Sequence, residues 1–400
     1  MFTATDMTPH ERYGFDYDID QWYEKCKDFT FKTVFLPITQ TEAKVIIKQY
    51  EINILKQNDK IFGEEDYEIY KKLEERIEDT LQANFYDEEE DAAVAFVRMS
   101  SRSPKDASFT SDEFKQILKR KLMEKGRMLP EDVQNEEFIS FFEAQIETLH
   151  FDSAEKILDI HCASTRVYED LQRALEFKSH DWTIHFVFRE LAKNHDIALE
   201  FRGFVYKRSL NALSQYYDPL YFRKLHKFKD IYLESIKQFF ESVKDQIPWE
   251  NCVMDFLITE AEDLDEPTLD DLQVQVVEFN PLNRFTGAAL FSWTHDTPLF
   301  CAEKPFEFRI RTEPLPVLSN ANIPYSSGGD AKTAIQLNLM DVDPTIINQY
   351  QDLLGMLENF MDDDFERINA NLRYVLQKTS KETFLQYFQT VESEEKSEPE

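Results

Sequence analysis

The spacing of apolar residues changes along this chain, and that change constrains the fold more than any other feature. Between residues 111 and 178 apolar side chains recur every third or fourth position, which is typical of amphipathic helices. Between residues 182 and 218 they recur every second position, which predicts two strands separated by a short polar segment and then a third. A boundary between two parts of the chain is therefore expected near residues 185–190.

The rest of the chain also mixes the two periodicities. Strands are predicted at 31–38, at the start of 93–107, at 252–259 and at 274–281, and long helices after residue 40, within 63–91 and within 219–247. Interleaved strands and helices of this kind indicate an α+β fold. We divide the chain into an N-terminal lobe (1–187, with a helical insertion at about 108–178), a second lobe (188–345), C-terminal helices (346–390) and a disordered acidic tail (391–400).

Charge limits the kinds of partner. The sequence has 77 acidic and 45 basic residues, a formal net charge of −32. A field of this sign opposes contact with the phosphates of nucleic acids, so no direct nucleic-acid partner is expected. It favours a basic protein partner, while a local group of arginines and lysines would still suit a nucleotide.

Other common classes are not indicated. No stretch approaches the roughly 18 apolar residues of a membrane helix, and the N-terminus lacks the basic-then-apolar pattern of a secretory signal. The four cysteines are scattered without a C-x-x-C pair, which argues against a zinc cluster or a disulfide scaffold. We therefore expect a cytoplasmic protein with no membrane partner.

Two predicted strands carry polar residues at positions where apolar ones are usual. Glu278 and Asn280, in VQVVEFNPLN, are two residues apart and so point to the same face, and Asp255 has the matching place in CVMDFLI. If the strands pair, Asp255 lies opposite them, and these oxygens suit Mg²⁺. The alternative is an exposed polar face, because Gln273 and Gln275 also alternate with valines.

Basic side chains follow or occupy other predicted strands. They are Arg98, Arg102 and Lys105 in FVRMSSRSPKDA, Arg189 in FVFRE, and Arg202, with Glu200, in LEFRGFV. Cations beside a metal site suit a nucleoside triphosphate, although a single arginine is more often the partner in a surface ion pair. Phosphate-loop, Rossmann and kinase motifs are absent from the sequence, so a nucleotide site would be of another kind.

Eight segments, in order, resemble the successive motifs of the cell division cycle 123 (D123) family. They are FKTVFLPI, FVRMSSRSPKDA, FVFREL, EFRGFV, QYYD, CVMDF, VVEFNP and ALFSW, and they span about residues 15–315. The resemblance implies an ATP-grasp fold, with two lobes of antiparallel sheet and a nucleotide site between them. Members of this family are eukaryotic assembly factors for translation initiation factor 2.

The resemblance also implies roles for individual residues. It assigns ATP contacts to Arg98, Ser103 and Lys105, to the backbone of Phe186, Val187 and Phe188 beside adenine, and to Arg189, Glu200, Arg202, Asp255 and Asn280. It assigns Mg²⁺ coordination to Asp255, Glu278 and Asn280. Three features depart from the family pattern: Arg98 stands where a lysine is expected, Glu278 where an aspartate is expected, and SSRSPKDA where W-S-A-P-[KR]-D-A is expected.

The resulting hypothesis is a monomeric assembly chaperone that binds ATP and Mg²⁺ and the γ subunit of translation initiation factor 2, with no need for ATP hydrolysis. The first alternative is an ATP-grasp ligase that joins a carboxylate to an amine. The second is a scaffold that keeps the fold without binding a nucleotide.

Overall fold

A computed structural model of the chain describes residues 15–57, 59–108, 111–125, 133–178, 180–192, 194–261 and 266–314. The chain divides into a larger unit (1–117, 143–218 and 222–312) and a smaller one (118–142, 219–221 and 313–400). Two helices, α5 (Asp112–Glu124) and α6 (Val133–Glu147), each run from one unit into the other. The helices predicted at 346–390 and the tail at 391–400 lie outside the described residues.

The larger unit contains two main sheets, of which the first has the order β1-β6-β4-β5 and is antiparallel. Its strands are β1 (Thr33–Pro37), β6 (His185–Arg189), β4 (Ala95–Met99) and β5 (His150–Phe151). A small separate hairpin joins β2 (Tyr86–Asp87) to β3 (Ala92–Ala93). Because β6 pairs with β1 along its whole length, the lobe boundary that we expected between residues 187 and 188 falls inside a strand of the first sheet.

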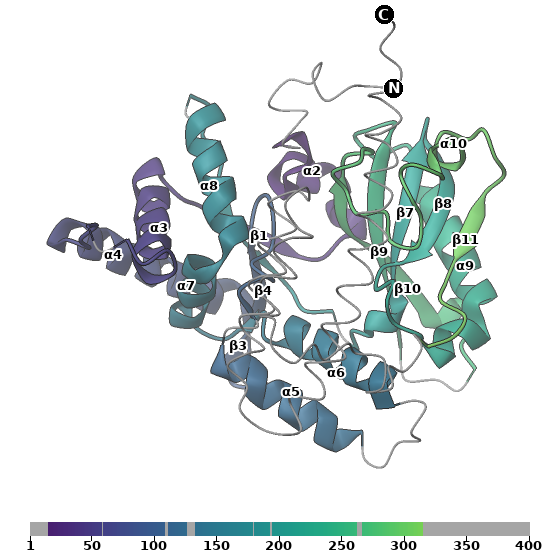
Figure 1. The fold of residues 1–400 in the computed structure, drawn as a ribbon, viewed down its shortest axis with the longest axis horizontal. Coiled ribbons are helices and arrows are strands. Elements are labelled where there is room, and N and C mark those ends of the chain that lie inside the picture. The colour runs from purple at the N-terminus through teal and green to yellow at the C-terminus, as the bar shows by residue number, and fades with distance from the viewer. Residues whose placement is uncertain are drawn as a thin grey trace, which may run out of the picture. The chain divides into compact units, whose positions relative to one another are not determined.

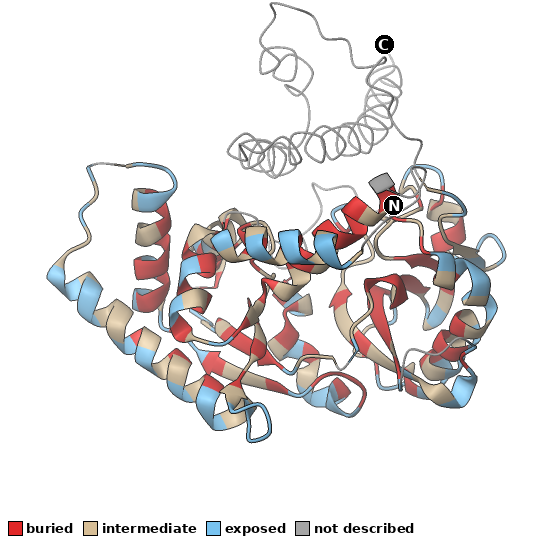
Figure 2. Cartoon of the chain, turned by 90° about the horizontal axis from the view of Figure 1, so that it is seen from below, coloured by how far each residue is buried: buried red, intermediate tan, exposed pale blue. Residues whose placement is uncertain are grey.

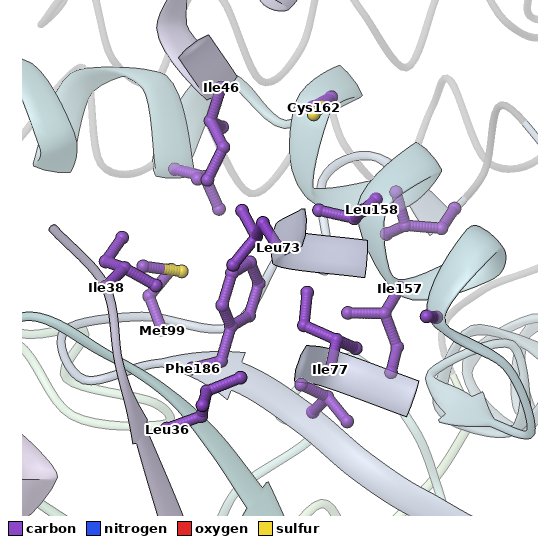
Figure 3. Close-up of a cluster of buried hydrophobic side chains, with 14 of the residues drawn as sticks. Leu36, Ile38, Ile46, Leu73, Ile77, Met99, Ile157, Leu158, Cys162 and Phe186 are labelled. Atoms are coloured by element: carbon purple, nitrogen blue, oxygen red, sulfur yellow. The ribbon is translucent and has the colours of Figure 1, made fainter. Parts of the chain in front are cut away.

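Helices cover one face of the first sheet, and Figure 1 shows them grouped beside β1 and β4. They are α3 (Gln40–Asn53), α4 (Glu64–Phe85), α7 (Ala154–Ala163) and α8 (Thr165–Phe177). On α4, Leu73, Ile77 and Leu81 recur every four residues and are fully buried, while most of the helix surface is charged. Figure 3 shows Leu73 and Ile77 meeting Phe186 of β6 and Ile157 of α7 in this core.

The second sheet has the order β10-β9-β7-β8-β11. Its strands are β7 (Glu200–Tyr206), β8 (Ser209–Gln215), β9 (Cys252–Glu260), β10 (Leu272–Asn280) and β11 (Glu307–Arg309), and only the β8–β11 pair among these described strands is parallel. Helix α9 (Arg223–Val243) covers one face, where Phe239 contacts Phe256. On the other face, Phe204 stacks on Phe300 of the short helix α10 (Thr297–Phe300). Red positions in Figure 2 mark the buried residues of both sheets and the inner sides of their helices.

A β-bulge at Val277 interrupts the alternation of β10. Val276 pairs with Phe256 and Glu278 with Asp255, so Val277 is the extra residue between them. The bulge shifts the alternation by one position, and Gln275 and Glu278 therefore face the same side although they are three residues apart. Together with Asp255 they face away from α9.

Buried polar contacts join the two sheets at this bulge. Thr30, just before β1, donates its hydroxyl to the Val276 carbonyl (2.6 Å). Arg189, at the end of β6, donates to the Val277 carbonyl (2.7 Å) and to the Thr30 hydroxyl (2.8 Å). Beside them, the Trp22 ring of α2 (Ile19–Cys26) meets Phe279 edge-on. We call these contacts of Thr30 and Arg189 with Val276 and Val277 the seam.

None of the helices in the described ranges is long and apolar enough to cross a lipid bilayer.

Candidate functional site

The predicted pairing of the two acidic strands is confirmed, and it brings three polar side chains together. Glu278 lies directly opposite Asp255 in the β9–β10 ladder. The Asn280 amide is 3.3 Å from Glu278 Oε1 and 3.5 Å from Asp255 Oδ2. The bulge at Val277 shifts the alternation of β10 by one residue, and from Glu278 onward regular alternation places Glu278 and Asn280 on the face of Asp255.

Arg202 of β7 completes this face of the second sheet. It pairs with Asp255 in the ladder, and its guanidinium forms a two-pronged ion pair with that carboxylate, Nε to Oδ1 at 2.8 Å and Nη2 to Oδ2 at 2.7 Å. Burial raises the pKa of Asp255 to about 6, against the opposing effect of Arg202. Burial disfavours the charged form of Arg202, but Asp255 outweighs it, and the pKa of the guanidinium lies above its usual range. The pair is therefore ionised at neutral pH.

Arg98 reaches the same site from the first sheet. Its Nη1 lies 2.6 Å from Glu278 Oε2, its Nη2 donates to the Ser101 carbonyl at 2.7 Å, and its Nε donates to the Met99 carbonyl at 3.2 Å. Burial alone would raise the pKa of Glu278, but Arg98, with Arg202 and Lys105, lowers it to about 2. The Glu278 carboxylate is consequently charged at any physiological pH.

Two further side chains border the cations. The Tyr216 ring, just after β8, lies 4.9 Å from the Arg202 guanidinium carbon, and its hydroxyl is 3.3 Å from Lys105 Nζ. We did not predict Tyr216 as a site residue, although it belongs to QYYD, one of the segments that carry the family resemblance. Lys105 lies in the loop after β4, so this contact adds a further link between the first part of the chain and the second sheet.

Glu200 lies on the same face of β7 as Arg202. Its Oε1 is 2.6 Å from His195 Nε2. Burial lowers the pKa of His195, but the contact with Glu200 outweighs it and the net shift is upward. Nothing in the spacing of the sequence indicated His195, because it belongs to the irregular segment before β7.

Other predicted residues lie elsewhere. Ser103 is half-buried in the loop after β4, and among the described residues the structure does not bring it into these contacts. The Arg189 guanidinium is buried and directed to the seam, where burial, with the repulsion from Arg98, lowers its pKa to about 9. Arg102, in the same loop as Ser103, binds Asp170 of α8 at 2.7 Å.

Phe186, Val187 and Phe188, whose backbone the resemblance places beside adenine, lie inside the first sheet. β6 is a central strand, and these residues pair with β1 on one side and with β4 on the other. Their backbone groups are thus engaged within the sheet. All three side chains are fully buried, and Phe186 and Phe188 belong to the helix-covered core. Of these three residues, Val187 alone points to the opposite face of β6, the face on which Arg189 also lies.

The donor set suits the metal that the resemblance implies. Asp255 and Glu278 offer four carboxylate oxygens and Asn280 an amide oxygen, all hard ligands of the kind that Mg²⁺ prefers. Each carboxylate oxygen already accepts a contact from Arg98, Arg202 or Asn280, so a metal would have to replace some of these contacts. Within the described ranges, no group of three or more His, Cys, Asp or Glu side chains is placed to hold a metal ion.

Comparisons with known proteins agree on one family. The D123 family model matches residues 22–323. Cdc123 from Schizosaccharomyces pombe is 20% identical, with a TM-score of 0.50 over 76% of this chain and 98% of that one, and its C-terminally truncated form is 19% identical, with a TM-score of 0.51 and the same coverage. No curated protein sequence matches. The structural likeness confirms the predicted α+β, ATP-grasp-like fold, and the match of the family model over most of the chain shows that the protein belongs to the D123 family.

Proposed function

We propose that the protein is a Cdc123-type assembly chaperone that binds ATP with Mg²⁺ and acts on the γ subunit of eukaryotic translation initiation factor 2. Membership of the D123 family supports the general class of function. The binding of ATP and Mg²⁺ and the identity of the partner are our proposal.

The observation that carries the nucleotide part is the convergence of three cations on two carboxylates and an amide. Arg98, Lys105 and Arg202 supply the positive charge, and Asp255 and Asn280 lie within the same group of contacts. Arginine forks and a lysine ammonium are the usual donors to phosphate oxygens. Bound Mg²⁺ would neutralise phosphate charge, and Asp255 and Asn280 have the oxygens to hold it.

The position of the site suggests why a chaperone would need a nucleotide. Arg98 belongs to the first sheet, whereas Arg202 and Asp255 belong to the second. A nucleotide held by residues of both sheets fixes one arrangement of the sheets relative to each other. A ligand that binds one arrangement better than another shifts the population toward it, and no hydrolysis is required for that. The acidic surface, with a net charge of −32, suits a basic partner surface.

Calorimetric titration with ATP and Mg²⁺ tests the nucleotide part. The wild type is expected to bind, and Asp255→Asn should weaken binding by at least about tenfold, because it removes a metal oxygen and leaves Arg202 without its counter-ion. Asp296→Asn is the matched control, because Asp296 also forms a two-pronged pair with an arginine, Arg309, whose Nη1 and Nη2 lie 2.8 and 2.9 Å from its oxygens. Absence of binding by the wild type would refute the proposal.

A second experiment tests the partner. The purified γ subunit should be retained by the wild type, more strongly with ATP and Mg²⁺ than without, and less by Asp255→Asn. The amount of ADP released should not rise with the amount of complex formed, because the proposal requires no hydrolysis. ADP release that is stoichiometric with a mass increase on an acceptor would instead favour the ligase.

A further inference from the structure

The two site residues that depart from the family pattern are in contact with each other. Arg98, at the position where the resemblance expects a lysine, and Glu278, where it expects an aspartate, form an ion pair at 2.6 Å. They are 180 residues apart in the sequence and come from different sheets, β4 and β10. The Arg98 side chain is 7% exposed and that of Glu278 is 25% exposed, so the pair is largely shielded from water.

All three guanidinium nitrogens of Arg98 are engaged. Glu278 holds Nη1, while the carbonyls of Ser101 and Met99 hold Nη2 and Nε. The two carbonyls belong to residues close to Arg98 in sequence, so of these three contacts the one with Glu278 is the one that comes from the other sheet. A lysine carries its three donors on one terminal nitrogen, so it cannot place them at the three separate positions that the planar guanidinium of Arg98 occupies.

Glu278 also acts electrostatically on a second buried cation, Arg189. Arg98 pairs with Val187 in the β4–β6 ladder, so Arg189, two residues further on, is its diagonal neighbour on the same face, within reach of long side chains. Arg189 is 3% exposed, and its guanidinium is held at the Val277 carbonyl, next to Glu278. Two like charges in this position repel each other, and the Glu278 carboxylate is the negative charge that offsets them.

Asp255 is placed differently. Both of its oxygens face Arg202 within the second sheet, and Asn280 is close to one of them. Its contacts therefore lie within one sheet, whereas the ion pair of Glu278 crosses to the other. The two carboxylates are adjacent, but Glu278 pairs with a cation of the first sheet and Asp255 with a cation of the second.

We propose that Glu278 is a positioning residue whose carboxylate holds Arg98 in place for the nucleotide and neutralises the Arg98–Arg189 pair, and that Asp255 and Asn280 supply the metal-binding oxygens. This inference refines the site of the proposed function and rests on it. It removes Glu278 from the metal ligands that the resemblance implies.

The first test compares how ATP affinity depends on free Mg²⁺. Glu278→Gln should bind ATP about tenfold more weakly at every Mg²⁺ concentration while keeping the wild-type dependence on Mg²⁺, since one charged contact is worth about a factor of ten. Asp255→Asn should lose most of that dependence. The proposal is overturned if Glu278→Gln loses the Mg²⁺ dependence as Asp255→Asn does.

Glu260→Gln controls for general destabilisation. Glu260 is a buried carboxylate of β9 that binds Lys224 and Tyr232, outside the site. This variant should be less stable but should bind ATP as the wild type does. If Glu260→Gln weakened ATP binding as much as Glu278→Gln, the effect of Glu278 would be structural only and the proposal would fall.

The second test needs no nucleotide. Urea unfolding of Arg98→Met, Glu278→Gln and the double variant forms a double-mutant cycle. The double variant should be more stable than the sum of the single effects predicts, by about tenfold in the unfolding equilibrium constant, because each single change leaves an unpaired charge. Additive effects would overturn the pairing. If the wild type does not bind ATP, the proposed function fails, while this cycle still decides whether Glu278 positions Arg98.

Discussion

His161 shows at the scale of one residue how an apolar environment decides what a titratable group does. The ring is fully buried between Phe151 and Phe186, its Nδ1 lies 2.7 Å from the Ile157 carbonyl, and Nε2 has no hydrogen-bond partner among the described residues. Burial lowers the pKa of His161 to about 4. The adjacent Cys162 faces the same core, so this pair is structural.

The lowered pKa predicts a specific loss of stability in acid. An unfolded chain protonates His161 near pH 6.5, whereas the folded chain resists protonation down to about pH 4. The stabilisation is therefore complete above pH 6.5 and is lost as the pH falls to 4, by up to about 3 kcal/mol. Urea unfolding at several pH values should show that His161→Phe lacks this part of the pH dependence.

The comparison must be made between variant and wild type at each pH. Burial raises the pKa of Asp18 to about 7, despite the opposing effect of Lys178. Asp18 thus contributes stability that is complete at low pH and lost as the pH rises toward 7, opposite in sign to His161. The Asp18 contribution is the same in the wild type and in His161→Phe, so it cancels from the difference between the two proteins, whereas the His161 contribution remains. Identical pH profiles for the two proteins would contradict the prediction.

Which residues meet could be predicted within one sheet but not between sheets. Asp255 opposite Glu278 followed from alternation in two neighbouring strands, because a strand fixes which side chains share a face. Arg98 against Glu278 did not follow, because nothing local in either strand specifies a partner 180 residues away. The bulge at Val277 could not be predicted either, because the sequence VVEF is compatible with a regular strand as well as with a bulged one.

At the scale of the element, the start of α3 is defined by a reciprocal cap. The Thr39 hydroxyl accepts from the Glu42 amide at 3.1 Å, and Glu42 accepts from the Thr39 amide at 2.6 Å. This capping box satisfies two amides that the helix itself cannot. Thr39→Ala should cost about 1 kcal/mol of unfolding free energy. Thr39→Ser keeps the hydroxyl and should cost much less, and equal losses for the two variants in urea unfolding would rule out the cap as the cause.

A buried ion pair joins the N-terminal segment to the end of α8. Lys178 Nζ lies 3.0 Å from the Asp18 carboxylate, with both side chains about 95% buried, and it also lies over the Phe15 ring. At pH 8, above the pKa of about 7 of the Asp18 carboxyl, Lys178→Met should lower the unfolding free energy by up to about 3 kcal/mol, because it leaves a buried carboxylate without its partner. The control is Lys27→Met, whose pair with Glu24 is exposed and should matter little. Similar urea midpoints for the two variants would refute this.

Long elements with a clear period were predicted, and very short ones were not. The strands predicted at 31–38, at the start of 93–107, at 252–259 and at 274–281 all appear, as do the three between 182 and 218, because alternation over five or more residues is a strong signal. β5, only His150–Phe151, lies within the segment 111–178, which we expected to be almost wholly helical. Two residues carry no period, and only the neighbouring strand β4 makes them extended.

For the larger unit as a whole, the seam decides how the two sheets act together. Arg189 is the buried cation at its centre, and one guanidinium bonds both the Val277 carbonyl and the Thr30 hydroxyl. The bulge presents that carbonyl to the first sheet instead of to β9. The seam is adjacent to Arg98 and Glu278, so motion between the sheets would directly alter the candidate nucleotide site.

This coupling predicts that Arg189→Lys loosens the second sheet where it meets the first. A lysine at this position cannot keep both contacts in the planar geometry of the guanidinium, and the loss should be about 2 kcal/mol. Hydrogen–deuterium exchange should quicken at residues 276–280. The control is Arg208→Lys. Arg208 also donates to two carbonyls, of Lys244 and Ile247, but these lie at and just after the end of α9, which covers the second sheet, and not in the first sheet. If exchange at 276–280 quickened equally in both variants, the seam would not be what couples the sheets.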